Sequence, residues 1–197
     1  MKEIIIATKN QGKVKEFEAL LAPIGFRVHS LLDYPDSIDV EETGKSFEEN
    51  AILKAEAIAM QYQRMTIADD SGLAIDYLGG KPGIFSARYA GPEKDDQANI
   101  NRVLEDLSDV HSLLDRSASF ICGLALSIPG EKTKTVVGTC EGYIATEPQG
   151  ENGFGYDPIF ILKNRNQTMA NLTKEEKNRI SHRADALKKL LEVIKQS

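Results

Sequence analysis

Two adjacent carboxylates follow a short apolar run in the first half of the chain. Asp69 and Asp70 come directly after residues 65–68 and precede Ser71 and Gly72. We expect residues 65–68 to form a buried strand that ends in a turn, so that a hard cation such as Mg²⁺ would relieve the gathered negative charge. Neighbouring side chains of an extended chain point to opposite faces, so the two acids should have different roles. The alternative is a surface turn in which an Asp caps backbone amides.

A second acidic segment precedes the next helix. Glu41 lies in the sequence Glu-Glu-Thr-Gly, where its carboxylate could complete a metal site or complement the dipole of the following helix. Within that helix, Lys54 follows Asn50 by four residues and shares its face. Lys54 could therefore meet a phosphate, or it could pair with a neighbouring acid.

A polar loop near the N-terminus joins a β-branched run to a helical pattern. Backbone N–H groups at the start of a helix and the positive end of its dipole attract anions, and Thr8, Asn10 and Lys13 add side-chain donors. A polyphosphate would fit such a loop. It is not a Walker loop, because the first glycine is missing and Val14 follows Lys13. An ordinary strand-to-helix turn is the alternative.

Two aromatic residues flank Gly155 at the end of the Gly-rich residues 150–155. Phe154, Tyr156 and Asp157 have a composition suited to stacking on a planar base and bonding its rim, although aromatics before a strand also pack in cores. His182 and Arg183 open the last helix and could donate hydrogen bonds to a base carbonyl. The rival interpretation, a Ser181–His182 nucleophile pair, is discounted, since adjacent residues cannot normally bond as nucleophile and base.

The elements that must position these residues mix strand–helix units with a hairpin. Capping boxes at Ser46 with Glu49 and at Thr173 with Glu176 predict two helix starts. Residues 118–128 and 133–145 are strand-like and are joined by a Pro-Gly turn, which predicts a long hairpin. We therefore expect an α/β fold with a mixed, twisted sheet flanked by helices and a cleft between two lobes. Strands are also predicted at residues 2–7, 26–31 and 156–162, and helices at 13–21, 46–62, 95–107 and 181–195.

Composition narrows the class of partner. A chain of 197 residues with 41% hydrophobic and 27% charged residues can bury a core, so it is not disordered. Its net charge of −6 argues against broad binding of nucleic acid or of anionic membranes. The apolar start is too short for a signal peptide and no apolar window reaches membrane length, so we expect a cytoplasmic protein. Cys122 and Cys140 are expected to be buried thiols.

Taken together, these segments resemble the inosine triphosphate pyrophosphatase family, also described as XTP/dITP diphosphatases. The matching blocks follow the family order over almost the whole chain, and Lys9 stands where the family often carries glycine. They are residues 7–13, 41–44, 68–73, 82–89, 154–160 and 181–183.

The resemblance implies Mg²⁺-dependent hydrolysis of ITP, dITP and XTP to the monophosphate and pyrophosphate. Glu41 and Asp70 would hold Mg²⁺, and Asp70 would also accept the proton of the attacking water. Lys54 would join the phosphate cluster, and Ser71 would lie beside the substrate. The triphosphate would bind Thr8, Lys9, Asn10, Gln11, Gly12 and Lys13, and the base and sugar would bind Phe154, Gly155, Tyr156, Asp157, Lys177, His182 and Arg183.

The resemblance also implies a single two-lobed domain over residues 1–197, with a long central mixed sheet and a substrate cleft, usually assembled as a homodimer. Two other functions stay open. One is a related diphosphatase for pyrimidine or modified nucleotides. The other is a nucleotide-binding regulator without catalytic activity.

Overall fold

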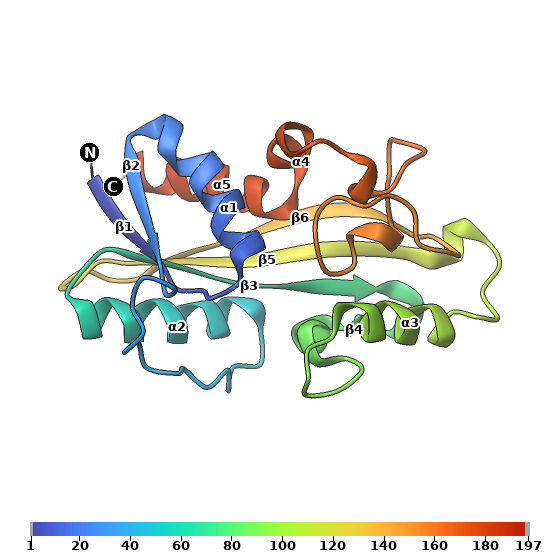
Figure 1. Ribbon diagram of the computed structural model, residues 1–197, viewed down its shortest axis with the longest axis horizontal. Coiled ribbons are helices and arrows are strands. Elements are labelled where there is room, and N and C mark those ends of the chain that lie inside the picture. Colours follow the sequence, from blue (N-terminus) through green and yellow to red (C-terminus); the bar gives the residue numbers. More distant parts are fainter. Residues whose placement is uncertain (1, 196–197) are drawn as a thin grey trace. The chain divides into compact units, whose positions relative to one another are not determined.

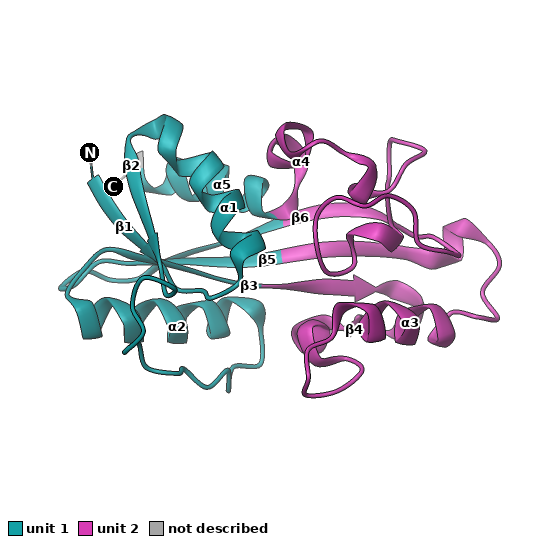
Figure 2. Cartoon of the chain, in the orientation of Figure 1, with its two compact units in different colours: residues 1–70, 122–138, 183–197 teal, residues 71–121, 139–182 magenta. Residues whose placement is uncertain are grey.

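The computed structural model describes residues 2–195, with side chains as far as Ile194. It divides into two compact units (Figure 2), each of which is formed by separate stretches of the chain. Unit 1 comprises residues 1–70, 122–138 and 183–197, and unit 2 comprises residues 71–121 and 139–182. The chain therefore passes from unit 1 to unit 2 between Asp70 and Ser71, inside a strand.

The strands form one mixed sheet. In the order β2-β1-β3-β5-β6-β7 each strand is bonded to the next, and β4 pairs with β3. Strand β1 is parallel to β2 and to β3, whereas the β3–β4 and β6–β7 pairs are antiparallel. The strands are β1 Lys2–Ile6, β2 Phe26–Ser30, β3 Thr66–Ile75, β4 Lys81–Pro82, β5 Ser117–Ser127, β6 Lys134–Ile144 and β7 Phe160–Leu162.

The register of β1 against β3 matters for the site. Ile6 lies opposite Ile67, and both strands run in the same direction. Continuing that register by two residues brings Thr8, at the start of the N-terminal loop, level with Asp69. The loop and the paired acids are therefore neighbours within unit 1, because β1 ends beside the first half of the longer, parallel strand β3.

Helices cover both faces of the sheet in unit 1. Helices α1 and α5 lie on one side of the strands and α2 lies on the other (Figure 1). Phe17 of α1 and Leu190 of α5 pack with Ile4 and Ile6, while Ile58 of α2 belongs to the opposite cluster. The α-helices are α1 Gln11–Leu21, α2 Phe47–Tyr62, α3 Asp96–Asp106, α4 Lys174–Ile180 and α5 His182–Lys195.

Unit 2 has a separate apolar core. Val103 of α3 packs with Leu73, Phe120 and Phe160 from three strands of the sheet. Beside this cluster the guanidinium of Arg116 is buried and donates to four backbone carbonyls at 2.7 to 2.9 Å. The guanidinium thus satisfies buried backbone carbonyls that follow α3 and end β6, which a wholly apolar core would leave without hydrogen bonds.

The local signals located most elements correctly. Ser46 accepts a hydrogen bond from the Glu49 amide at 3.2 Å and caps α2, and Thr173 forms the predicted capping box at α4. Strands β5 and β6 are neighbours in the sheet and are joined by a short connection, as the Pro-Gly turn indicated. The predicted mixed sheet flanked by helices is confirmed.

Two local predictions were wrong. The turn expected at Asp69 to Gly72 does not exist, and the surface-turn alternative fails with it, because β3 continues to Ile75. Leu73 and Ile75 are buried with the strand, and the Leu73 amide donates to Ser86 Oγ at 2.8 Å. The strand predicted at residues 156–162 is shorter, since Asp157–Ile159 forms a 3-10 turn with a proline in its first turn.

The prediction of a substrate cleft between two lobes stays a prediction. Within residues 2–195, no helix is both long enough and apolar enough to cross a membrane.

Candidate functional site

The N-terminal loop is held by its own side chains. Thr8 Oγ1 accepts from the Asn10 amide at 3.2 Å, and Asn10 Oδ1 accepts from the Lys13 amide at 3.1 Å and caps α1. Lys9, Asn10 and Gln11 are exposed, and Thr8, Gly12 and Lys13 are half-buried. The loop therefore enters α1 with a fixed backbone and an open polar surface.

Asp69 lies in a buried cluster of four charges. Its Oδ2 atom lies 2.9 Å from Lys13 Nζ and 2.9 Å from Arg183 Nη2. Arg183 also binds Glu16, and its guanidinium lies 5.7 Å from the centre of the Phe17 ring. Burial alone would lower the pKa of Arg183, but the carboxylates of Asp69 and Glu16 raise it above its ordinary value. The cluster holds two acids and two bases and is neutral.

Asp70 lies in a second cluster of unit 1. Its Oδ2 accepts from Asn50 Nδ2 at 2.9 Å, and its Oδ1 lies 3.6 Å from Lys54 Nζ. The same ammonium bonds Glu42 Oε1 at 2.8 Å and the backbone oxygen of Asp69 at 2.8 Å. The two acids of β3 thus have different partners, as their alternation along an extended strand predicted.

The charge balance of this second cluster differs from that of the first. Burial raises the pKa of the Asp70 carboxyl; Lys54 and the hydrogen bond from Asn50 oppose that rise, and Glu42 adds to it. Burial would lower the pKa of Lys54, but Asp70, Asp69 and Glu42 raise it. Both groups therefore favour bound protons: Asp70 mainly because it is buried, and Lys54 because carboxylates surround its ammonium. An additional cation would be attracted to Asp70 more strongly than to Asp69.

The acidic turn before α2 presents Glu42 rather than Glu41 to this cluster. Gly44 donates its amide to Asn50 Oδ1 at 2.8 Å, and a Cβ at Gly44 would lie 2.6 Å from that oxygen. Only glycine allows this approach, so the turn is pressed against the start of α2 with Glu42 above Lys54. The Glu41 side chain is exposed and makes no hydrogen bond or ion pair with another described residue. Ser71 is half-buried at the start of unit 2.

The aromatic loop of unit 2 is held by two acids. Asp157 Oδ2 accepts from the Phe154 amide at 3.0 Å and from Lys177 Nζ at 2.5 Å. Lys177 also lies 4.5 Å from the centre of the Phe154 ring. Asp96 Oδ2, in the first turn of α3, accepts from the Gly155 amide at 2.8 Å. These contacts bring a ring, a carboxylate and an ammonium together.

Two predicted residues of unit 2 are packed into its interior. Tyr156 is buried in the core and donates its hydroxyl to the Ser86 carbonyl at 2.7 Å, and burial raises the pKa of its phenol. It is therefore a core aromatic, the alternative for this stretch. His182 is buried and stacks on Phe120 with ring centres 4.9 Å apart and planes 19° apart.

The structure thus gathers Lys13, Lys54, Asp70 and Arg183 in unit 1, and Phe154, Asp157 and Lys177 in unit 2. It adds three partners that the sequence analysis did not select: Glu16, Glu42 and Asp96. Asn50, noted there for sharing a face with Lys54, bonds Asp70. Helical spacing could have indicated Glu16, three residues after Lys13. In residues 2–194, no three His, Cys, Asp or Glu side chains are close enough to hold a metal by themselves.

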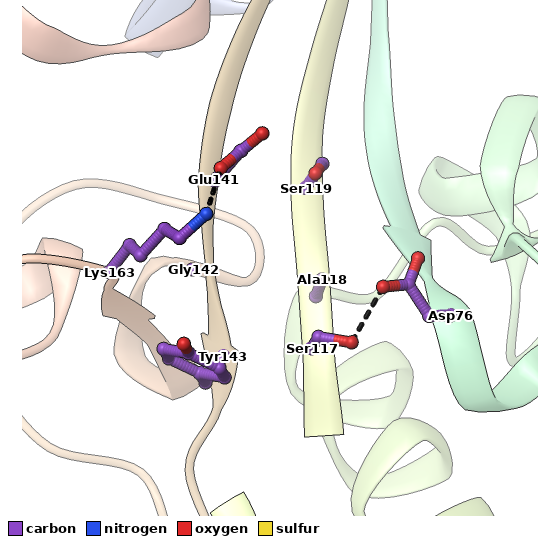
Figure 3. Close-up of a pocket in the computed structure, with 8 residues that line it drawn as sticks. All are labelled: Asp76, Ser117, Ala118, Ser119, Glu141, Gly142, Tyr143 and Lys163. Carbon is purple, nitrogen blue, oxygen red and sulfur yellow. Dashed lines mark hydrogen bonds and ion pairs between the residues drawn. The ribbon is translucent and has the colours of Figure 1, made fainter. Parts of the chain in front are cut away.

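A polar pocket of about 180 Å³ lies on strands β5 and β6 of unit 2 (Figure 3). Lys163 pairs with Glu141 at 2.5 Å, and Ser117 donates to Asp76 at 2.6 Å. None of the predicted site residues lines this pocket. Its one ammonium is paired with Glu141, and Asp76 adds a second carboxylate, so the pocket offers no excess positive charge to a phosphate ligand.

Comparison with known proteins gives matches over the full length of the chain. The model of the Ham1 family matches residues 4–193. A Bacillus subtilis protein named dITP/XTP pyrophosphatase is 62% identical over 194 residues, which cover 98% of each chain. A Bacillus licheniformis protein of the same name is 58% identical over 197 residues and covers 100% of both chains.

Solved structures agree with these sequence matches. The Staphylococcus aureus Ham1 protein superposes with a TM-score of 0.86 at 47% identity, covering 99% of both chains. A HAM1 protein from Coxiella burnetii gives a TM-score of 0.86 at 43% identity and covers 100% of both chains. The family that the motifs predicted is confirmed: the chain belongs to the Ham1 family.

Proposed function

We propose that this protein is a dITP/XTP pyrophosphatase, which hydrolyses non-canonical purine nucleoside triphosphates to the monophosphate and pyrophosphate. The observation that carries the proposal is the cluster around Asp70, a buried carboxyl with a raised pKa next to Lys54. Relatives that carry this name match the chain from end to end. A carboxylate that readily accepts a proton is what the activation of an attacking water requires.

The residues around Asp70 fit a magnesium ion. Two carboxylates share one ammonium there, and Mg²⁺ is commonly bound by one or two carboxylates together with waters and substrate phosphates. Asp70 and a carboxylate of the Glu41–Glu42 turn would hold it. Glu41 is the ligand predicted from the family resemblance, and Glu42 is the one in contact with Lys54. When bound, the ion would neutralise charge on the phosphates.

Side chains and backbone amides of unit 1 would bind the phosphates, stabilise the leaving group and activate the attacking water. The loop from Thr8 to Lys13 would bind the phosphate chain through its amides and its lysine. Lys54 would add positive charge close to Asp70 and stabilise the negative charge that develops on the leaving pyrophosphate. Asp70 would take the proton of the water that attacks the α-phosphorus in line. Ser71, the next residue of β3, would lie beside the substrate.

Base selection would belong to the aromatic loop. Phe154 would stack on the purine, and the Lys177 ammonium would donate to the oxo group at position 6 of hypoxanthine or xanthine. Adenine carries an amino group there and would leave that donor unpaired. A buried donor without a partner costs about 1 to 3 kcal/mol, roughly a tenfold to hundredfold or greater loss per contact. Guanine also has the oxo group, so its exclusion must act at position 2.

A substrate panel tests the proposal. Pyrophosphate release from ITP, dITP, XTP, GTP, ATP and a pyrimidine triphosphate should be measured with and without Mg²⁺. We expect release from the first three only, and only with the metal. Equal cleavage of ITP and ATP would contradict the role of the aromatic loop. Cleavage of the pyrimidine nucleotide alone would indicate a different diphosphatase, and binding of ITP without release would indicate a regulator. The predicted homodimer is tested separately by sedimentation.

Asp157→Asn should weaken substrate binding more than turnover. The change leaves Lys177 without its carboxylate and weakens the bond that holds the Phe154 amide. We expect KM for ITP to rise by about tenfold, the cost of one charge-assisted contact, while kcat changes less. Arg165→Gln, which breaks an exposed ion pair with Glu176 in the same unit, is the matched control. A fall in kcat at constant KM would show that Asp157 acts on the chemical step instead.

A further inference from the structure

Asp69 holds both lysines that the proposed function assigns to phosphate. Its carboxylate oxygen Oδ2 lies 2.9 Å from Lys13 Nζ, and its backbone oxygen accepts from Lys54 Nζ at 2.8 Å. The carboxylate is wholly buried, whereas the Lys13 side chain is 17% exposed. The Lys13 ammonium can therefore contact solvent or a ligand, while the buried carboxylate of Asp69 neutralises its charge and stays out of reach of the ligand.

The positive charge of Lys13 is already neutralised within its own cluster. The Asp69 cluster is neutral before any ligand arrives, because Asp69 and Glu16 offset Lys13 and Arg183. A polyphosphate that binds Lys13 consequently approaches a carboxylate a few ångströms behind the ammonium. At that separation, in a partly shielded site, a unit charge has a large influence on the binding of a multiply charged anion.

We propose that Asp69 is a positioning residue that acts through Lys13: it fixes the ammonium at the loop and weakens the binding of free polyphosphate, so that pyrophosphate can leave. This inference rests on the proposed role of the Thr8 to Lys13 loop. Interactions that bind ground state and product too tightly do not raise turnover. A phosphate-binding lysine with a built-in counter-ion would avoid that loss.

Binding of inorganic pyrophosphate to the intact protein tests the inference without any nucleotide. Calorimetry in metal-free buffer at low ionic strength should compare the wild type with Asp69→Asn, which changes the carboxylate and leaves the backbone contact with Lys54. We expect the variant to bind pyrophosphate about tenfold more tightly, because one nearby negative charge is gone. A purely structural role would give the opposite sign, since a loosened site binds more weakly. Asp69→Ser repeats the test if the first variant does not fold.

A double-mutant cycle with Lys13→Met tests whether Asp69 acts through Lys13 or simply through its negative charge. In the Lys13→Met background, Asp69→Asn should change pyrophosphate affinity by less than about twofold, because coupled residues are not additive. Glu16→Gln is the matched control, since it removes the same charge from the Arg183 side of the cluster. We expect it to tighten binding by less than about threefold.

The results that would overturn the inference are equal or weaker binding in Asp69→Asn, or the same gain when Lys13 is absent. If the wild type binds no measurable pyrophosphate, Asp69→Asn must acquire binding, and failure to do so counts against the inference. Tighter binding in a protein that hydrolyses no triphosphate would refute the proposed function alone. Hydrolysis of ITP with unchanged pyrophosphate affinity in Asp69→Asn would refute the inference alone.

Discussion

Replacement of Asp70 by Asn is expected to lower ITP turnover by about 10³-fold or more, within the roughly 10²- to 10⁴-fold contribution of a positioned base. The amide oxygen can still accept from Asn50 Nδ2, so the packing of the site is retained. It cannot accept the proton of the attacking water, and it supplies no negative charge to a metal. The measurement is kcat and KM for pyrophosphate release at saturating Mg²⁺.

The same substitution should not weaken the fold at neutral pH. Because the folded-state pKa of Asp70 is raised mainly by burial, the ionised carboxylate opposes folding above that pKa, and the cost fades as the pH falls through it. Asp70→Asn should therefore melt at the same temperature as the wild type or higher at pH 7.5, with the difference shrinking towards pH 4. Thermal unfolding at both pH values checks this sign.

Asp76→Asn is a suitable control for the loss of turnover. Asp76 is exposed, follows the end of β3, and accepts a hydrogen bond from Ser117. It should leave kcat unchanged. If Asp70→Asn retained wild-type turnover while Asp76→Asn lost it, the role of active carboxylate would have been assigned to the wrong aspartate.

Local patterns predicted the parts of the fold that depend on local contacts. The caps of α2 and α4 involve residues three apart, and the hairpin of β5 and β6 depends on one turn. The turn predicted at Asp69 failed for the converse reason. Ser and Gly favour turns in isolation, but Leu73 and Ile75 have buried positions to fill, and tertiary packing outweighed the local preference.

The partners of the predicted site residues depend on distant contacts. Glu16 and Arg183 are 167 residues apart, and Asp69 and Arg183 are 114 apart. No spacing rule connects such pairs; only the parallel pairing of β1 with β3 and the packing of α5 in unit 1 bring them together. The family resemblance could assign Arg183 to a ligand, but it could not indicate that this guanidinium lies between two buried acids.

The turn that contains Glu41 and Glu42 shows that a sequence pattern can locate a site without identifying which residue forms it. Either carboxylate of Glu41 and Glu42 satisfies the pattern, and adjacent residues differ only in the direction in which they project. That direction is set by Gly44 against Asn50, a contact that depends on how the turn folds back on α2. The sequence therefore located the metal-binding segment that we propose, but it could not choose between neighbouring side chains.

Arg183→Ala is expected to lower the free energy of unfolding by about 3 to 5 kcal/mol, the usual cost of removing one partner from a buried ion pair. Arg183 is 1% exposed and binds two carboxylates, Asp69 and Glu16, so its loss leaves excess negative charge inside unit 1. Denaturant unfolding measures the change. Arg165→Ala breaks an exposed pair with Glu176 and should leave the free energy of unfolding nearly unchanged, because solvent screens that pair.

The pH dependence of the Arg183→Ala deficit separates charge from packing. A buried carboxylate without its counter-ion binds a proton more readily in the folded state than in the unfolded state, so stability is lost above the folded-state pKa and regained below it. The deficit relative to wild type should consequently shrink between pH 7.5 and pH 5. Adding Glu16→Gln to the variant should recover part of the stability at pH 7.5, because one of the unpaired charges is then absent. A deficit that is constant with pH and unaffected by Glu16→Gln would mean that the guanidinium stabilises unit 1 by filling space against Phe17 rather than by neutralising the two acids.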